Sequence, residues 1–275
     1  MPRKLASAKP HSDVFTALLI PALAVLIASA PAIATPVAAH TAAPQAAGGE
    51  LPAARDVIDR HIEAIGGRDA IQDHTSSYAR GSIEVVGQGL VGTMEIFAAA
   101  PNHTLVIVDF PAVGVESRTG YNGEVGWSID PMTGERLLQG GELQQLVDEA
   151  DYYGDLHAPE KFTSMETVDQ VEFDGRPAYK LELVHTSGRH VLEYFDVETG
   201  RLIGVEGPQE SLMGTMNAVT TLGEYQSFGD LMVPTSMYQD LGGLQTIRVT
   251  IEAVELDNVD PAVFALPPAI EALRR

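Results

Sequence analysis

Hydrophobic and polar residues alternate with a period of two along most of the chain from Ser77 onward. The alternation is clearest over residues 246–254, where Ile247, Val249 and Ile251 are separated by polar side chains. A period of two places successive side chains on opposite faces of a β-strand. The pattern therefore predicts strands that each have one apolar and one polar face.

Short turn sequences separate about eleven such runs. Asn122-Gly123, Asp174-Gly175 and Gly242-Gly243 are three of them, and each can supply the left-handed backbone of a tight hairpin. Sequential hairpins form an antiparallel meander, which curls as it twists. We therefore predict a mainly β chain with few helices, in which about eleven antiparallel strands form a curved sheet or half-barrel.

Two segments follow a helical period instead. The first ends at Gly66-Gly67 and has its apolar stripe at Val57, Ile58, Ile62 and Ile65. The second, at residues 141–152, has its stripe at Leu143, Leu146, Val147 and Ala150. We predict an N-terminal helix packed on the sheet and a mid-chain helix that acts as a lid.

The first fifty residues have a different character. Three cations precede an apolar run at 14–27, and Ala32-Ile33-Ala34 forms a small-residue cleavage site. An uncleaved membrane anchor is disfavoured because the run is short and contains Pro21. We predict a signal peptide at 1–34, a disordered Ala/Pro/Gly-rich linker at 35–50, and a single half-barrel domain at 51–275. The expected product is periplasmic or secreted, and soluble after cleavage.

Charge and cysteine content narrow the function classes. The net charge is -21, with 38 acidic and 17 basic residues, so the surface repels phosphate backbones and anionic lipids. Nucleic-acid binding is excluded on this basis, and no integral membrane protein is expected after cleavage. The chain has no cysteine, which excludes thiolate catalysis, cysteine-ligated metal centres and a lipid-modified N-terminal cysteine.

No catalytic signature stands out. The chain has no nucleophile elbow, zinc-binding helix, P-loop or dinucleotide fingerprint. His185 and His190 could meet across one hairpin, but a metal site needs a third ligand, so solvent-edge histidines are the favoured interpretation. His61 lies on the apolar stripe of the first helix, which favours a buried, hydrogen-bonded residue over a base. We predict no enzyme activity, no catalytic residue, no metal and no cofactor.

Four local sequences are similar to those of the LolA/LolB lipoprotein-carrier superfamily, the outer-membrane lipoprotein-sorting-like proteins. They are Ile-Gly-Gly-Arg-Asp-Ala at 65–70, Gly-Tyr-Asn-Gly-Glu-Val-Gly-Trp at 120–127, Phe-Asp-Gly-Arg-Pro-Ala-Tyr at 173–179 and Tyr-Phe-Asp-Val-Glu-Thr-Gly-Arg-Leu at 194–202. The resemblance implies a half-barrel whose carriers hold acyl chains between a concave sheet and a helical lid. No functional residue of a known carrier can be matched to a position in this chain.

Two functions remain open. The first is a periplasmic carrier that binds a lipid, a lipoprotein acyl chain or another apolar ligand on the concave face. The second is a non-catalytic sensor or partner-binding module of the cell envelope on the same scaffold. Trp127, the single tryptophan, is either a core residue or a pocket aromatic. For the carrier, the expected cavity residues are Ile83, Val85, Met94, Ile96, Leu105, Ile107, Trp127, Leu181, Leu183, Leu192, Val249 and Ile251 on the sheet, with Leu143, Leu146 and Val147 on the lid.

Overall fold

The computed structural model describes residues 50–212 and 214–275. The predicted signal peptide and all of the predicted linker except Glu50 lie outside the described residues. Among the helices that are described, none is long and apolar enough to cross a membrane.

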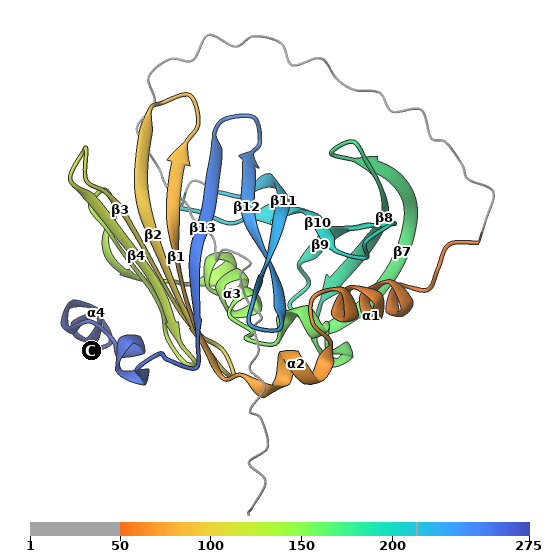
Figure 1. Cartoon of the computed structure of the whole chain (residues 1–275). Helices are drawn as coiled ribbons and strands as arrows, with labels where there is room; N and C mark the ends of the chain where they lie inside the picture. Colours follow the sequence, from red (N-terminus) through yellow and green to blue (C-terminus); the bar gives the residue numbers. More distant parts are fainter. Residues whose placement is uncertain (1–49, 213) are drawn as a thin grey trace, which may run out of the picture.

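The described chain forms one antiparallel sheet of thirteen strands (Figure 1). The strands are β1 (Ser76–Val85), β2 (Leu90–Ala99), β3 (His103–Phe110), β4 (Val115–Asn122), β5 (Gly126–Asp130), β6 (Gly134–Leu137), β7 (Phe162–Phe173), β8 (Arg176–His185), β9 (His190–Asp196), β10 (Leu202–Gln209), β11 (Met216–Phe228), β12 (Leu231–Leu241) and β13 (Thr246–Leu256). The predicted fold class, a curved antiparallel sheet with few helices, is confirmed. The count is higher than predicted in part because β6 has only four residues and no apolar alternation.

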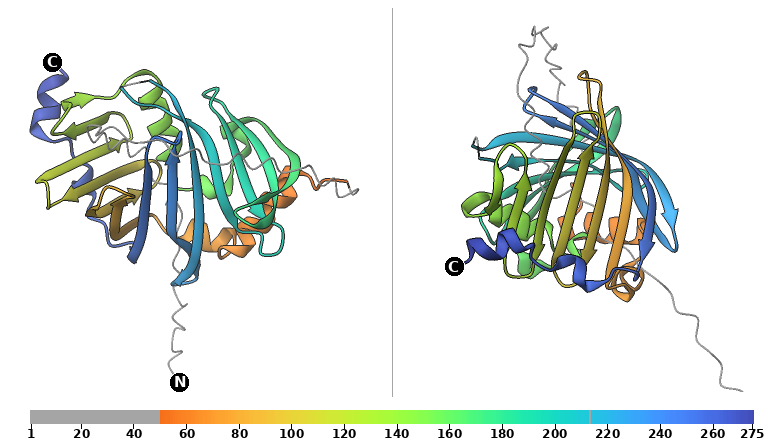
Figure 2. Two further views of the ribbon diagram at one scale, coloured as in Figure 1. Left: turned by 90° about the horizontal axis from the view of Figure 1, so that it is seen from above. Right: turned by 90° about the vertical axis from the view of Figure 1, so that its left-hand side faces the viewer.

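The strand order is β6-β5-β4-β3-β2-β1-β13-β12-β11-β10-β9-β8-β7. The first and last strands therefore pair at the middle of the sheet, with Ile83 opposite Val249. The two edges are β6 and β7, which are consecutive in the chain. The segment that links them must cross from one edge of the curved sheet to the other (Figure 2).

This crossing segment contains α3 (Gly140–Glu149), η1 (Gly154–Leu156) and η2 (Pro159–Lys161). Helix α3 is attached to both arms of the sheet. On one arm Arg136 of β6 donates two hydrogen bonds of 2.8 Å to the Glu142 carboxylate. On the other, Arg189 pairs with Glu149 at 2.9 Å, and the Gln145 Nε2 atom donates to the β10 residue Gln209 at 3.2 Å. The mid-chain helix thus spans the open side of the half-barrel.

The N-terminal helices α1 (Ala54–Ala64) and α2 (Arg68–Asp73) close one end of the half-barrel (Figure 1). The apolar stripe of α1 is buried and belongs to the same core cluster as the inner residues of β1, β2 and β13. The chain leaves α1 beside β12, where the Met232 amide donates to the Ile65 carbonyl at 3.0 Å. The end of α1 is therefore fixed to the sheet by a backbone hydrogen bond.

Part of the outer face of β2 to β6 is covered as well. The C-terminal segment, with η3 (Pro261–Phe264) and α4 (Pro268–Leu273), runs across this face (Figure 2). Phe264 and Ile270 pack there with Leu105 and Trp127 in a separate apolar cluster. On this arm, the part of the outer face beneath this segment is consequently apolar and covered, whereas Glu116 and Arg118 on the same face of β4 are exposed.

Candidate functional site

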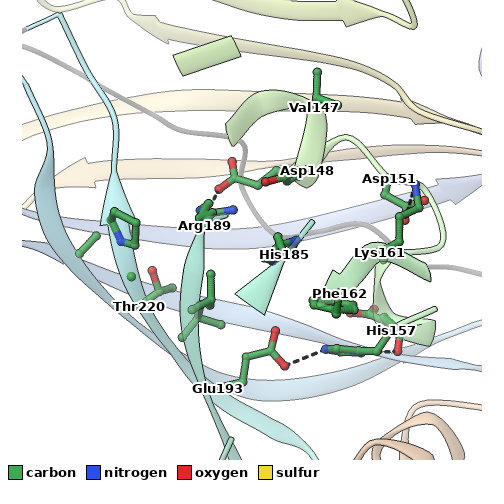
Figure 3. Close-up of a pocket in the computed structure, with 18 of the residues that line it drawn as sticks. Val147, Asp148, Asp151, His157, Lys161, Phe162, His185, Arg189, Glu193 and Thr220 are labelled. Atoms are coloured by element: carbon green, nitrogen blue, oxygen red, sulfur yellow. Dashed lines mark hydrogen bonds and ion pairs between the residues drawn. The ribbon is translucent and has the colours of Figure 1, made fainter. Parts of the chain in front are cut away.

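A cavity of about 280 Å³ lies between the inner face of β8 to β12 and the crossing segment (Figure 3). Its floor comes from alternate positions of neighbouring strands, because only every second side chain of a strand points inward. The apolar part of this floor consists of Val191, Val205, Ala218, Leu222 and Met237. The roof comes from α3, which supplies Val147 and Asp148, and from Phe162 at the start of β7. The floor therefore combines these apolar side chains with polar ones such as Glu193 and Thr220, and the upper edge is polar.

The charged groups at the upper edge are largely paired with one another. Arg189 binds Glu149, and Lys161 lies 3.6 Å from the Asp151 carboxylate. Asp148 accepts a hydrogen bond of 2.8 Å from the Ser187 hydroxyl. These contacts join α3 to the β8–β9 turn and η2 to the loop that follows α3.

A buried ion pair lies at the inner end of the cavity. The Nε2 atom of His157 is 2.7 Å from a Glu193 carboxylate oxygen, and both side chains are less than one-tenth exposed (Figure 3). His157 has a left-handed backbone (φ 46°), and its Nδ1 atom donates to the Asp155 carbonyl at 2.9 Å. Both ring nitrogens therefore face acceptors, an arrangement that suits the imidazolium form.

The pKa values of the pair follow from this geometry. Burial alone lowers the pKa of His157, but the charge of Glu193 and its hydrogen bond reverse the effect and raise the pKa to about 9. Burial alone raises the pKa of Glu193, but the positive charge of His157 has a larger effect in the opposite direction. The pKa of Glu193 is therefore lowered overall. The pair is accordingly ionised at neutral pH, although it is buried.

His61 lies behind this pair and has the opposite character. Its side chain is buried in α1, and its Nδ1 atom accepts a hydrogen bond of 3.2 Å from the Leu202 amide. Burial and the nearby positive charge of His157 lower its pKa to about 3, so the ring is neutral. The prediction that His61 is a buried, hydrogen-bonded residue is confirmed.

The two hairpin histidines have separate surroundings. His185 lines the cavity beside Phe162, with ring centroids 4.7 Å apart, and burial lowers its pKa. His190 is exposed and lies 3.7 Å from the Glu182 carboxylate. Within residues 50–212 and 214–275 no group of three or more His, Asp or Glu side chains could hold a metal ion.

Comparison with solved structures shows which fold the chain has. No protein-family model matches the chain, and no curated protein matches its sequence. Three solved structures are similar: a DUF1329 family protein from Desulfovibrio piger (TM-score 0.54, 12% identity, 77% of this chain and 97% of that one), a LolA superfamily protein from Nitrosomonas europaea (0.53, 14%, 78% and 99%), and an outer membrane lipoprotein-sorting protein domain from Vibrio parahaemolyticus (0.51, 14%, 81% and 100%). The chain has the LolA-type fold.

The LolA-type sheet divides the predicted cavity residues between its two faces. Eight lie in the core of the concave face: Ile83, Val85, Met94, Ile96, Leu181, Leu183, Val249 and Ile251. Leu143 and Leu146 of α3 pack on Tyr121 and Leu138 instead of facing the cavity. Of all fifteen, Val147 alone lines the cavity that the structure describes.

The other four residues face the opposite side, so the prediction of an inward orientation is wrong for them. Leu105, Ile107 and Trp127 pack under the C-terminal segment on the outer face. Leu192 packs beside Tyr194 on the outer face of β9. The physical reason is that the outer face also carries apolar clusters at these positions, so alternation alone does not identify the concave face. Trp127 is thus a core residue of the outer cluster.

Several residues of the site were missed by sequence reasoning. Glu193 sits in a run of apolar residues on β9, and this break in the pattern was the one available signal. His157 lies in a loop with no motif around it. Gln209 and Thr220 are ordinary polar residues whose orientation depends on strand register. Their assembly needs contacts between segments far apart in the chain.

Proposed function

We propose that this LolA-type protein is a non-catalytic carrier of the cell envelope that binds an apolar chain in the cavity beneath α3. The observation that carries the proposal is a cavity with five apolar side chains on its floor, beneath a helix that contacts one arm of the sheet through polar groups and the other arm through an apolar cluster. Burying an apolar chain there contributes about 0.8 kcal/mol for each CH₂ group. One of the similar structures is described as an outer membrane lipoprotein-sorting protein domain, and this description supports an apolar chain as the ligand.

The cavity size sets a limit on the ligand. A volume of about 280 Å³ is just below the usual range of ligand pockets, roughly 300–1,000 Å³. It suits one short apolar chain with a small polar head. A longer chain requires α3 to move, which breaks its ion pairs to Arg136 and Arg189 and separates its apolar side chains from Tyr121 and Leu138.

The location is part of the same proposal. We place the mature protein in the periplasm, after cleavage of the leader behind Ala34. Fractionation of cells that express the full chain, with the intact mass of the product, tests it. A product that starts after residue 34 in the periplasmic fraction is expected, and a membrane-bound chain that retains the apolar run would contradict it.

Ligand binding is tested by filling the cavity. Thr220 lines the floor on β11, and Thr220→Phe places a ring in the cavity. The neighbouring Val219 faces the other side of the same strand, so Val219→Phe is the matched control. We expect Thr220→Phe to weaken binding of a fluorescent fatty acid at least tenfold and to remove lipid that co-purifies with the native protein. Val219→Phe should leave both unchanged.

The result is decisive in either direction. Equal binding by the two variants, or no bound lipid and no probe binding by the unaltered protein, argues against a carrier. Stable capture of an envelope protein without lipid would favour the sensor or partner-binding alternative.

A further inference from the structure

Two hydrogen-bond donors beside the cavity have no acceptor. They are the Arg189 Nε atom and the Gln209 Nε2 atom, which are buried and have no partner within residues 50–212 and 214–275. Both residues line the cavity, where Arg189 is labelled in Figure 3. Buried donors are almost always paired in folded proteins, because an unpaired one loses its hydrogen bonds to water without replacement. Two such donors together point to an acceptor that a ligand supplies.

The two donors belong to neighbouring strands. Leu192 of β9 lies opposite Glu206 of β10, and the same register places Arg189, directly before β9, opposite Gln209. Side chains of residues that lie opposite each other in an antiparallel pair are close enough to bind one group between them. A carbonyl oxygen has two lone pairs and can therefore accept from both donors at once.

The orientation of the Gln209 amide is fixed by its neighbours. The Glu210 amide donates to the Gln145 Oε1 atom at 2.8 Å. The Gln145 Nε2 atom therefore donates, to Glu149 at 2.9 Å and to the Gln209 Oε1 atom at 3.2 Å. A flipped Gln209 would place its NH₂ group against the NH₂ group of Gln145. The Gln209 Nε2 atom is consequently turned away from Gln145, and it stays unpaired.

The charge of the cavity lining selects among possible acceptors. Five carboxylates line the cavity, against the cations Lys161, Arg189 and protonated His157, so negative charge is in excess. An anionic head would add to this excess, and Arg189 already pairs with Glu149. An ammonium head has no lone pair to offer to the two donors. An uncharged carbonyl group meets both requirements.

We propose that Arg189 and Gln209 form a subsite for the carbonyl oxygen of an uncharged ligand, an ester, an amide or a ketone. This subsite rests on the proposed carrier function and specifies the polar group of the ligand. The apolar part of the ligand then lies on floor residues such as Val191 and Val205. The carbonyl group is bound inside the cavity, beside the α3 residues that hold both donors in place.

Displacement of the fluorescent fatty acid by three compounds with the same chain length tests the subsite. The compounds are methyl decanoate, decanoate and decylammonium, all at pH 8, with protein purified after expression of the full chain. We expect the ester to displace the fluorescent probe at about one-tenth of the concentration that either charged compound requires.

A variant shows whether Gln209 causes this preference. Gln209→Met keeps the length of the side chain and removes the donor, so we expect it to reduce the preference to about twofold or less. Loss of the contact with Gln145 affects all three compounds alike, so the ratio between ester and acid separates the two effects. Gln226→Met is the matched control, because Gln226 is outside the cavity lining and donates to the Thr235 hydroxyl. It should keep the preference of the unaltered protein.

The outcomes separate the subsite from the carrier function. If decanoate displaces the probe from the unaltered protein as well as the ester does, or better, the subsite is wrong and the carrier proposal stands. A preference for the ester that survives in Gln209→Met overturns the subsite as well. If neither the probe nor any of the three compounds binds, the carrier proposal fails, and the subsite fails with it.

Discussion

Removal of the carboxylate beside His157 should change how the stability of the protein depends on pH. In Glu193→Gln the imidazole stays buried but loses the negative charge that stabilises its protonated form. Burial then dominates, and the pKa of His157 falls below its ordinary value. The imidazolium that the folded protein holds at neutral pH is lost in the variant.

The magnitude follows from linkage between protonation and folding. The pKa of His157 rises from 6.5 to about 9 on folding, so the folded state binds the proton more tightly by about 3 kcal/mol. Because the folded pKa is the higher one, this stability is fully present below pH 6.5 and is lost as the pH rises through 9. The pKa of His61 is lowered on folding, so its effect appears as the pH falls below 6.5, at the acid end of the range in which the His157 contribution is already complete.

The assay is urea unfolding of both proteins at several pH values between 6 and 9.5. We expect the difference in free energy of unfolding between them to be largest at pH 6 and to shrink by about 3 kcal/mol by pH 9.5. Glu182→Gln is the matched control, since Glu182 faces His190 at an exposed hairpin. The free energy of unfolding of Glu182→Gln should differ little from that of the unaltered protein at every pH.

A difference that stays constant across this range would refute the reasoning, because it would mean that His157 is not protonated in the folded state. A difference that grows with pH would refute it as well, because the folded pKa would then be lowered.

Two further predictions concern the packing of the sheet. Phe264→Ala should lower the free energy of unfolding by about 3–5 kcal/mol. It should also shift the fluorescence emission of Trp127 to longer wavelength, because both residues belong to the outer cluster. Unchanged emission would mean that the C-terminal segment does not shield the indole. Gly204→Ala should destabilise the protein by about 1–3 kcal/mol, because the added Cβ would lie 2.2 Å from the Phe173 ring. A Cβ added at Gly223 would have no atom within 4 Å, so Gly223→Ala should be close to neutral. Equal urea midpoints for the two variants would contradict this.

Much of the fold follows from local pattern. The period of two along β13 and the glycines at turns such as Asp174-Gly175 determine strands and hairpins, since these depend on neighbouring residues. The stripe of α1 predicts a helix with one buried face for the same reason. Gly134–Leu137 has no such pattern, and its strand exists because β5 offers a free edge for hydrogen bonding.

The site depended on contacts that no local pattern encodes. His157 and Glu193 are 36 residues apart, and Gln145 and Gln209 are 64 apart, so their pairing follows from the path of the crossing segment. Alternation also divides a strand into two equivalent faces. Ile83 and Leu105 have the same apolar character, yet one faces the concave core and the other the C-terminal segment.

The sequence by itself therefore determined the elements and their antiparallel succession. The tertiary structure alone decided which face is concave, what covers the other, and which polar groups meet at the cavity. The physical reason is that curvature and closure come from the summed twist and packing of all thirteen strands. A local pattern of side chains has the same form on either side of the sheet.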